Sequence, residues 1–64
     1  MVVWTIEKTG TTIQLDKSGW FVCRKGKAYR FNSLRECLAY LAGCREIKHD
    51  HIDLLMRSTW ERYE

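Results

Sequence analysis

Basic side chains are concentrated in one short part of the chain. Residues 17–35 contain six of them and no acidic residue, whereas residues 1–16 carry a net charge of −1 and residues 36–64 a net charge of −2. The stretch GWFVCRKGKAYRF, residues 19–31, also contains aromatic side chains. Basic groups hold phosphates by charge and an aromatic ring stacks on a base, so this combination predicts a binding surface for nucleic acid.

The same charges have a second explanation, because lysine and arginine at a hairpin tip keep a domain soluble and protect an edge strand from aggregation. A surface made only for solubility usually mixes both signs of charge, which favours binding. We therefore expect a contact surface for nucleic acid or for an acidic protein. Its predicted members are Lys17, Phe21, Arg24, Lys25, Lys27, Arg30 and Arg35.

Four potential metal ligands follow one another in the chain: Cys37, Cys44, His49 and His51. Their spacing, C-x6-C-x4-H-x-H, matches none of the familiar zinc patterns, and Cys37 lies on a predicted buried stripe. We expect no metal ion and no cofactor.

Catalysis is not expected either. A cysteine nucleophile needs a histidine placed by the fold and a concave pocket around both, and a chain of 64 residues has little volume for one. Its glycines are isolated, so no phosphate-cradling loop is present. The prediction is a protein without catalytic residues or a small-molecule substrate.

The bulk composition indicates one folded domain over residues 1–64, with 45% hydrophobic and 30% charged residues. A chain this short buries only about 60% of the surface that it exposes when unfolded. Three cysteines are too few and too irregular for a disulfide framework. No apolar run is long enough to span a membrane and the N-terminus lacks a secretory pattern, so we expect a cytoplasmic protein.

Alternating residues predict two strands, over residues 2–8 and 11–16, joined by a turn at Thr9-Gly10. In the first, Val2, Trp4 and Ile6 share one face, with Val3, Thr5 and Glu7 on the other.

Two more strands, over residues 20–24 and 27–31, flank Lys25-Gly26. A two-residue loop pairs Val22 with Tyr29 and Trp20 with Phe31 on the core side, whereas a three-residue loop would reverse the faces. With the two-residue loop, we expect Arg30 and the turn residues to lie near Phe21 on the outward side.

A helix is predicted over residues 34–42. Ser33 and Glu36 form a capping box, and Gly43 suits the left-handed residue after the helix end. One face of this helix is apolar and should pack on the sheet. Its residues are Leu34, Cys37, Leu38 and Leu41.

A second helix is predicted over residues 49–62, with Asp50 as a candidate N-cap. Its apolar stripe is formed by Ile52, Leu55, Met56, Thr59 and Tyr63, with Trp60 beside it. The fold class is therefore α+β, with a small antiparallel sheet of three to four strands followed by two helices. Met56, Trp60 and Tyr63 are a candidate protein interface, because so small a domain has difficulty covering them all.

The order of GW-F-V, a KGK turn, YRF and the capped helix NSLRECLAYL resembles the strand, strand and helix core of plant ethylene-response domains and phage integrase arm-binding domains. The resemblance covers about 25 residues. It implies a sheet that contacts DNA, and the second helix is an addition to that pattern.

Two functions remain open. The first is a non-enzymatic protein that binds nucleic acid through a basic β-hairpin. The alternative is a protein-binding regulator or inhibitor that acts on a host protein complex, as a monomer or as a homodimer through the C-terminal helix, and that is similar in size to phage-encoded factors.

Overall fold

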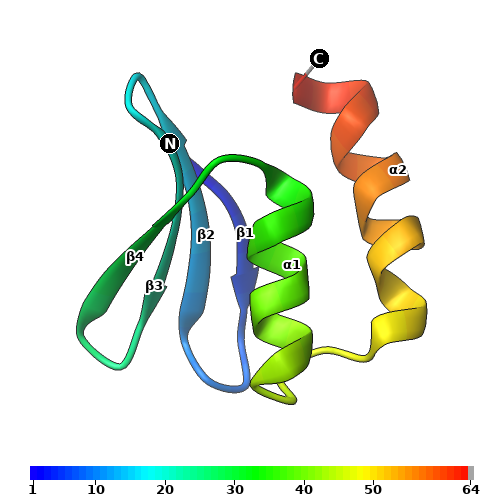
Figure 1. Ribbon diagram of the computed structural model, residues 1–64, viewed down its shortest axis with the longest axis horizontal. Helices are drawn as coiled ribbons and strands as arrows, with labels where there is room; N and C mark the ends of the chain where they lie inside the picture. The colour runs from blue at the N-terminus through cyan, green and yellow to red at the C-terminus, as the bar shows by residue number, and fades with distance from the viewer. Residues whose placement is uncertain (64) are drawn as a thin grey trace.

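A computed structural model describes the backbone of residues 1–63 and the side chains of residues 1–57. Four strands come first: β1 (Val2–Ile6), β2 (Thr11–Asp16), β3 (Gly19–Arg24) and β4 (Lys27–Phe31). They are followed by α1 (Leu34–Gly43), the 3₁₀ helix η1 (His49–His51) and α2 (Ile52–Tyr63) (Figure 1). The strands form one antiparallel sheet in the order β1-β2-β3-β4, which confirms the predicted α+β class.

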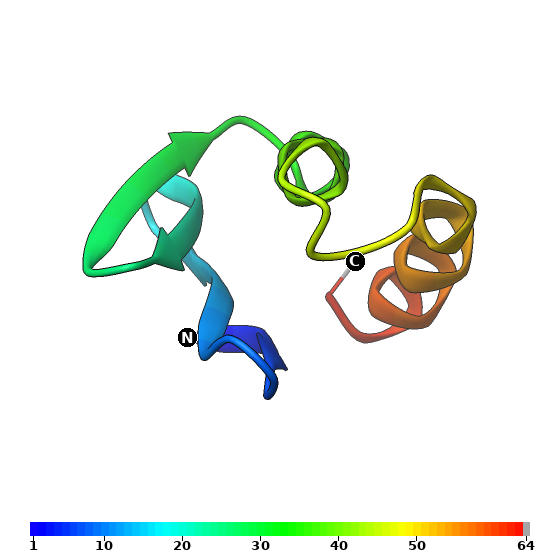
Figure 2. The same ribbon diagram turned by 90° about the horizontal axis from the view of Figure 1, so that it is seen from below.

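Both helices lie on the same side of the sheet (Figure 2). α1 packs against the sheet, and α2 lies beyond α1, on the side away from β4. Side chains on the inward face of the sheet therefore meet the helices. The outward face has no other element of the described chain over it.

The β3–β4 hairpin has the predicted two-residue loop. Lys25 (φ 52°) and Gly26 (φ 77°) both adopt positive φ, as a type I′ turn requires. Val22 pairs with Tyr29 and Trp20 with Phe31, so the predicted register is confirmed. Val22 is fully buried, whereas Trp20 and Phe31 are half-buried and Tyr29 lies at the exposed rim of the core.

The predicted faces of β1 are wrong at its first residue. A β-bulge lies between Val2 and Trp4, so Val2 pairs with Gln14 while Trp4 pairs with Ile13. The extra residue turns Val2 to the outward face, where it is 52% exposed, and Val3 packs against the core instead. Strand β1 also ends at Ile6, two residues before the predicted end.

Helix α1 begins as its capping box predicts. The Ser33 hydroxyl accepts a hydrogen bond from the amide of Glu36 at 3.2 Å, and the Glu36 carboxylate accepts one from the amide of Asn32 at 2.9 Å. The predicted apolar face of α1 packs on the inward face of the sheet. The buried cluster consists of Ile13, Val22, Leu34, Cys37, Leu38 and Leu41.

Helix α1 ends in a Schellman motif, in which the amides of Arg45 and Glu46 bond to the carbonyls of Ala42 and Leu41, both at 3.0 Å. The left-handed residue of this motif is Arg45 (φ 61°), not Gly43 as the sequence predicted. Gly43 is the last residue of the helix, because α1 runs one residue further than expected.

The predicted second helix begins as the 3₁₀ turn η1, and α2 proper starts at Ile52. Lys48 occupies the N-cap position of η1 and makes no side-chain cap, so Asp50 is not the N-cap. Ile52, Leu55 and Met56 pack against the core as predicted, while Leu54 is 63% exposed. No helix among the described residues has both the length and the apolar character needed to cross a membrane.

Candidate functional site

The strand register divides the predicted basic surface between the two faces of the sheet. Phe21 pairs with Arg30, in the outward row that also contains Gln14. Arg24 pairs with Lys27, and both alternate with the inward residues Val22 and Tyr29. The structure thus corrects the expectation that Arg24 lies beside Phe21.

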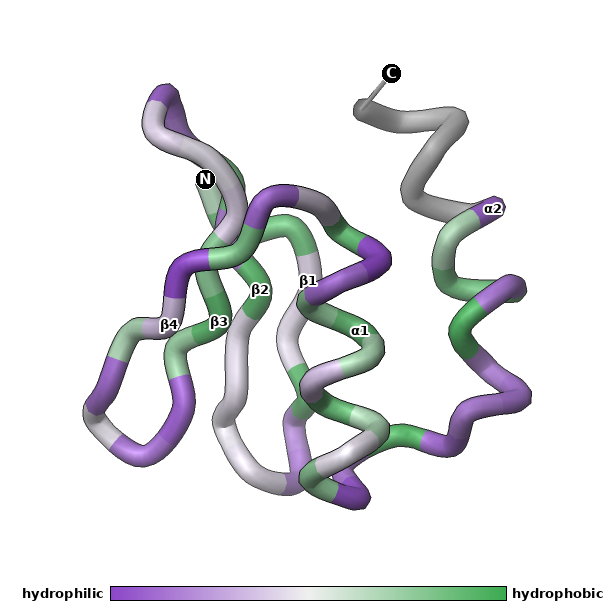
Figure 3. Tube along the Cα trace, in the orientation of Figure 1, coloured by the Kyte–Doolittle hydropathy of each residue, from purple (hydrophilic) through white to green (hydrophobic). Residues whose placement is uncertain are grey.

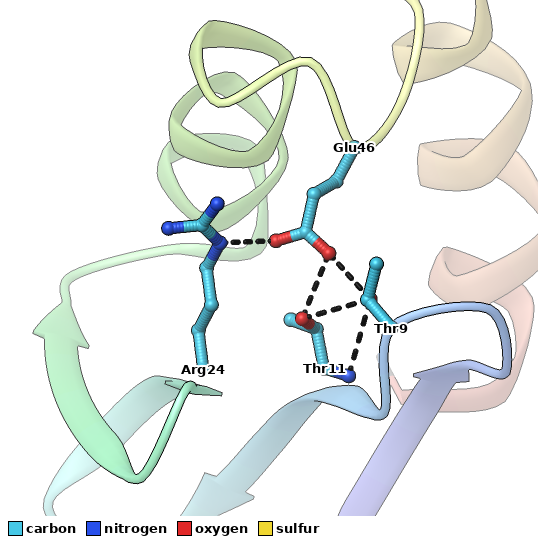
Figure 4. A network of polar contacts seen from close by, with 4 residues as sticks. All are labelled: Thr9, Thr11, Arg24 and Glu46. Carbon is cyan, nitrogen blue, oxygen red and sulfur yellow. Dashed lines mark hydrogen bonds and ion pairs between the residues drawn. The ribbon is translucent and has the colours of Figure 1, made fainter.

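Arg24 points to the helix side and binds Glu46, which follows α1 (Figure 4). Its Nε donates to Oε2 of the carboxylate, while the hydroxyls of Thr9 and Thr11 donate to Oε1 at 2.5 and 2.8 Å. The side chain of Glu46 is 6% exposed and that of Arg24 is 21% exposed. We call these four residues the Glu46 network.

Charge and hydrogen bonding stabilise the ionised groups of this network. Burial acts to raise the pKa of Glu46, but the hydrogen bonds from Thr9, Thr11 and Arg24 outweigh it, so the pKa lies below its ordinary value. The hydrogen bond to Glu46 raises the pKa of Arg24. Arg24 therefore serves first as the counter-charge of a buried carboxylate.

Arg30 lies on the outward face and reaches toward the β2–β3 turn. Its Nε donates to the carbonyl of Ser18 at 2.9 Å, next to Lys17 in the chain. Arg30 passes over Gly19, where a Cβ would lie 3.4 Å from Nη2 of Arg30, an ordinary van der Waals distance. Lys17 belongs to the same turn, so two predicted basic residues, Arg30 and Lys17, are associated with this end of the sheet.

Phe21 is the aromatic residue of that face among the described side chains, and it is half-buried. The side chains that share the face are mostly small or uncharged: Val2, Thr5, Thr12, Gln14, Cys23 and Ala28. The exception is Asp16 at the end of β2, whose carboxylate accepts hydrogen bonds from the amide and the hydroxyl of Ser18. Phe21 and its neighbour Arg30 thus lie on an open surface without a covering helix. We call Phe21, Arg30 and Lys17 the outward-face cluster.

The remaining predicted basic residues lie elsewhere. Lys25 and Lys27 are exposed at the β3–β4 tip, where Figure 3 shows strongly hydrophilic residues. Arg35 lies in the first turn of α1, and its Nη2 is 3.6 Å from Oδ1 of Asp53 in α2, in an exposed ion pair that contributes little to stability. The structure therefore does not gather all six cations into one patch.

The predicted protein interface is only partly described. Met56 packs against the core, and the side chains of Trp60 and Tyr63 lie outside the described residues. Between β1 and α2 is a groove of about 910 Å³. Trp4 and Ile6 line it from the strand, and Leu54 and Leu55 from the helix.

Among the residues that the structure describes, no three His, Cys, Asp or Glu side chains come close enough to hold a metal ion. Cys37 is fully buried, and burial, with the nearby charge of Glu36, raises the pKa of its thiol to about 11. This thiol belongs to the core.

Sequence reasoning missed Glu46 and Thr11, the centre of the Glu46 network. Thr11 alternates with the inward residue Ile13, so a buried polar group could have been suspected there. Nothing near Glu46 in the sequence indicates its partners, which lie 22 to 37 residues away. Comparison of the chain with known proteins finds no matching family model, curated protein or solved structure.

Proposed function

We propose that the protein binds single-stranded nucleic acid on the outward face of its sheet. Phe21 stacks on a base, while Arg30 and Lys17 bind the adjacent phosphates. Lys25 adds positive charge at the other end of the β3–β4 hairpin, whereas Lys27 belongs to the inward row with Arg24. The observation that supports this most is the pairing of Phe21 with Arg30 on a face that no helix covers.

The geometry favours single strands over a duplex. A basic ribbon that enters a DNA groove needs its cations along the inserted hairpin. Here Arg24 is turned to the helix side and bound to Glu46, which takes one cation away from the outward side of the hairpin. An open sheet face with an aromatic side chain instead suits unpaired bases, whose ring faces are accessible.

The test is fluorescence anisotropy with a labelled oligothymidine that carries a 5′-hydroxyl, measured at low salt. Replacing Phe21 by leucine keeps an apolar side chain of similar size but removes the aromatic ring. Base stacking on an aromatic residue contributes about 1–3 kcal/mol, so F21L should weaken binding by that amount. Absence of binding by the native protein at low salt would refute the proposal.

Charge is tested separately with the double variant K17Q/R30Q. Its matched control is K48Q/R57Q, which removes the same charge from exposed residues outside the outward-face cluster. The first variant should lose affinity and the second should resemble the native protein. Equal losses in both would mean that only net charge matters.

A second candidate is self-association through the groove between β1 and α2. The observation that favours it is the exposure of Leu54, 63%, beside apolar side chains of the strand. Sedimentation velocity of the native protein and of L54E tests this function. A dimer that the substitution dissociates would support it, and a native monomer at high concentration would exclude it.

A further inference from the structure

Three segments far apart in the sequence meet at one end of the molecule. They are the β1–β2 turn, the β3–β4 turn and the chain that follows α1 (Figures 1 and 3). Together they line a pocket of about 340 Å³. We call it the loop pocket.

The loop pocket has an excess of positive charge. Lys8, Arg24, Lys25 and Arg45 line it, against one acidic residue, Glu46. Arg24 neutralises Glu46 through the ion pair described above. The other three cations make no ion pair within the described part of the chain.

Two of these cations occupy backbone positions that disfavour them. Lys25 (φ 52°) and Arg45 (φ 61°) are the non-glycine residues with positive φ in the described chain, and both line the loop pocket. Glycine or asparagine adopts this conformation at lower cost, and those residues are usual in type I′ turns and Schellman motifs.

The turns themselves do not need these side chains. The last carbonyls of α1 are bonded by backbone amides, those of Cys44, Arg45 and Glu46, at 3.0 Å each. In the hairpin, the conformation of Lys25 is set by the two-residue loop. Strained residues are often found at functional positions. Because the turns do not need the side chains of Lys25 and Arg45, a functional role for their positive charge would explain why these residues are present.

We propose that the loop pocket binds a phosphate group, with Lys8, Lys25 and Arg45 supplying charge around it. Arg24 adds its terminal nitrogens, because the hydrogen bond to Glu46 uses Nε. The pocket volume lies in the range of small-ligand sites, so it accommodates a phosphate with part of the group that carries it.

Two sources share this chemistry: a small phosphorylated molecule and the terminal phosphate of a nucleic acid. The inference does not rest on the proposed function: Lys17, Phe21 and Arg30 take no part in the pocket, and Lys25 is the one residue that both proposals use. Lys8→Gln leaves Lys25 in place, so it tests the pocket apart from the outward face. Failure of one proposal therefore leaves the other standing.

The first experiment titrates the ¹⁵N-labelled protein with inorganic phosphate at constant ionic strength, with chloride as the balancing anion. We expect saturable amide shifts in the three segments that line the pocket, residues 8–11, 24–27 and 44–46. Shifts that never saturate, or that are no larger in these segments than elsewhere, would overturn the proposal.

The decisive variant is K25N/R45N, because asparagine suits both backbone positions and removes both charges. It should melt at the same temperature as the native protein or higher, yet bind phosphate about tenfold more weakly. Lys8→Gln touches neither strained position and should also weaken binding. The control K48N/R57N removes two charges outside the pocket and should bind like the native protein.

Unchanged phosphate affinity in both K25N/R45N and K8Q would refute the proposal. A final comparison identifies the source, using oligothymidines with a 5′-phosphate and with a 5′-hydroxyl. Tighter binding of the phosphorylated strand, lost in K25N/R45N, assigns the pocket to a nucleic-acid terminus. Equal binding of both strands, together with saturable binding of inorganic phosphate, assigns it to a small phosphorylated molecule.

Discussion

The Glu46 carboxylate connects parts of the chain that share no secondary structure. Its partners lie on the β1–β2 turn, on β2 and at the end of β3. A buried carboxylate without such partners would cost several kcal/mol, because its charge would be neither hydrated nor paired. Here both of its oxygens accept hydrogen bonds, so the group holds the loops together.

Replacing Glu46 by glutamine should lower the free energy of unfolding at pH 7 by about 1–2 kcal/mol, because the charge-assisted bonds are lost. The variant keeps the size of the side chain. Urea unfolding followed by circular dichroism measures the difference. Glu7→Gln, at an exposed position of the β1–β2 turn, is the control and should have little effect.

The same variant should show a characteristic pH dependence. The pKa of Glu46 in the folded state lies below its ordinary value of 4.5, so the unfolded chain binds the proton more readily. Its stabilising contribution is complete above pH 4.5 and is lost as the pH falls through the lower, folded-state pKa. The stability difference between native protein and E46Q should therefore shrink below pH 4.5. A difference that stays constant into strong acid would contradict this account.

The Cys37 thiol should resist modification in the folded protein. Its pKa of about 11 leaves little thiolate at pH 8, and the side chain is fully buried. Mass spectrometry after brief treatment with iodoacetamide should find Cys37 unmodified in native protein and modified in urea. Rapid native modification at Cys37 would mean that α1 separates from the sheet.

Single residues also show what the sequence alone can reveal. The charge clustering pointed to Arg24, Lys25 and Arg30, but not to the side of the sheet on which each lies. Arg24 was predicted on the outward side because it was treated as a turn residue, although strand alternation from Val22 puts it on the inward side. What no local pattern indicates is its partner, Glu46, which lies 22 residues away.

Secondary-structure elements with local signals were predicted well. The β3–β4 hairpin follows from Lys25-Gly26 and the flanking alternation, and the start of α1 follows from Ser33 and Glu36. The bulge in β1 was missed, since one extra residue leaves the composition of VVWTI unchanged. The end of α1 was missed because Arg45 takes a conformation that usually marks glycine.

The capping box of α1 should be worth about 1 kcal/mol. Ser33→Ala removes the acceptor for the Glu36 amide and should lower the urea midpoint without changing the slope of the transition. Ser33→Asp is the matched control, because its carboxylate also caps a helix. A midpoint restored by aspartate assigns the loss to capping, while equal losses in both variants would contradict that assignment.

The molecule as a whole has two unlike sides. The helix side contains the core, the groove beside α2 and the loop pocket, whereas the outward side is an open sheet face. The sequence predicted the layers, because the apolar faces of strands and helix must meet. The division of the cations between these sides follows from the predicted register of β3 and β4, but the ion pair that holds Arg24 on the helix side does not, since Glu46 lies 22 residues away.

This division makes the salt dependence of nucleic-acid binding a quantitative test. Each phosphate neutralised on a single strand contributes about −0.7 to the slope of log K against log salt concentration. If Lys17, Arg30 and Lys25 all contact phosphates, the native slope should be roughly −2 with a 5′-hydroxyl oligothymidine. Anisotropy titrations over a series of salt concentrations give this value.

The variants then show how much the residues at each end of the hairpin contribute to this slope. K17Q/R30Q should bring it to roughly −0.7, because two phosphate contacts are lost, while K48Q/R57Q should leave it near the native value. F21L should weaken binding at every salt concentration with no change in slope, since stacking releases no counterions. A native slope near zero, or an equal reduction by both double variants, would show that the outward-face cluster is not where the strand lies.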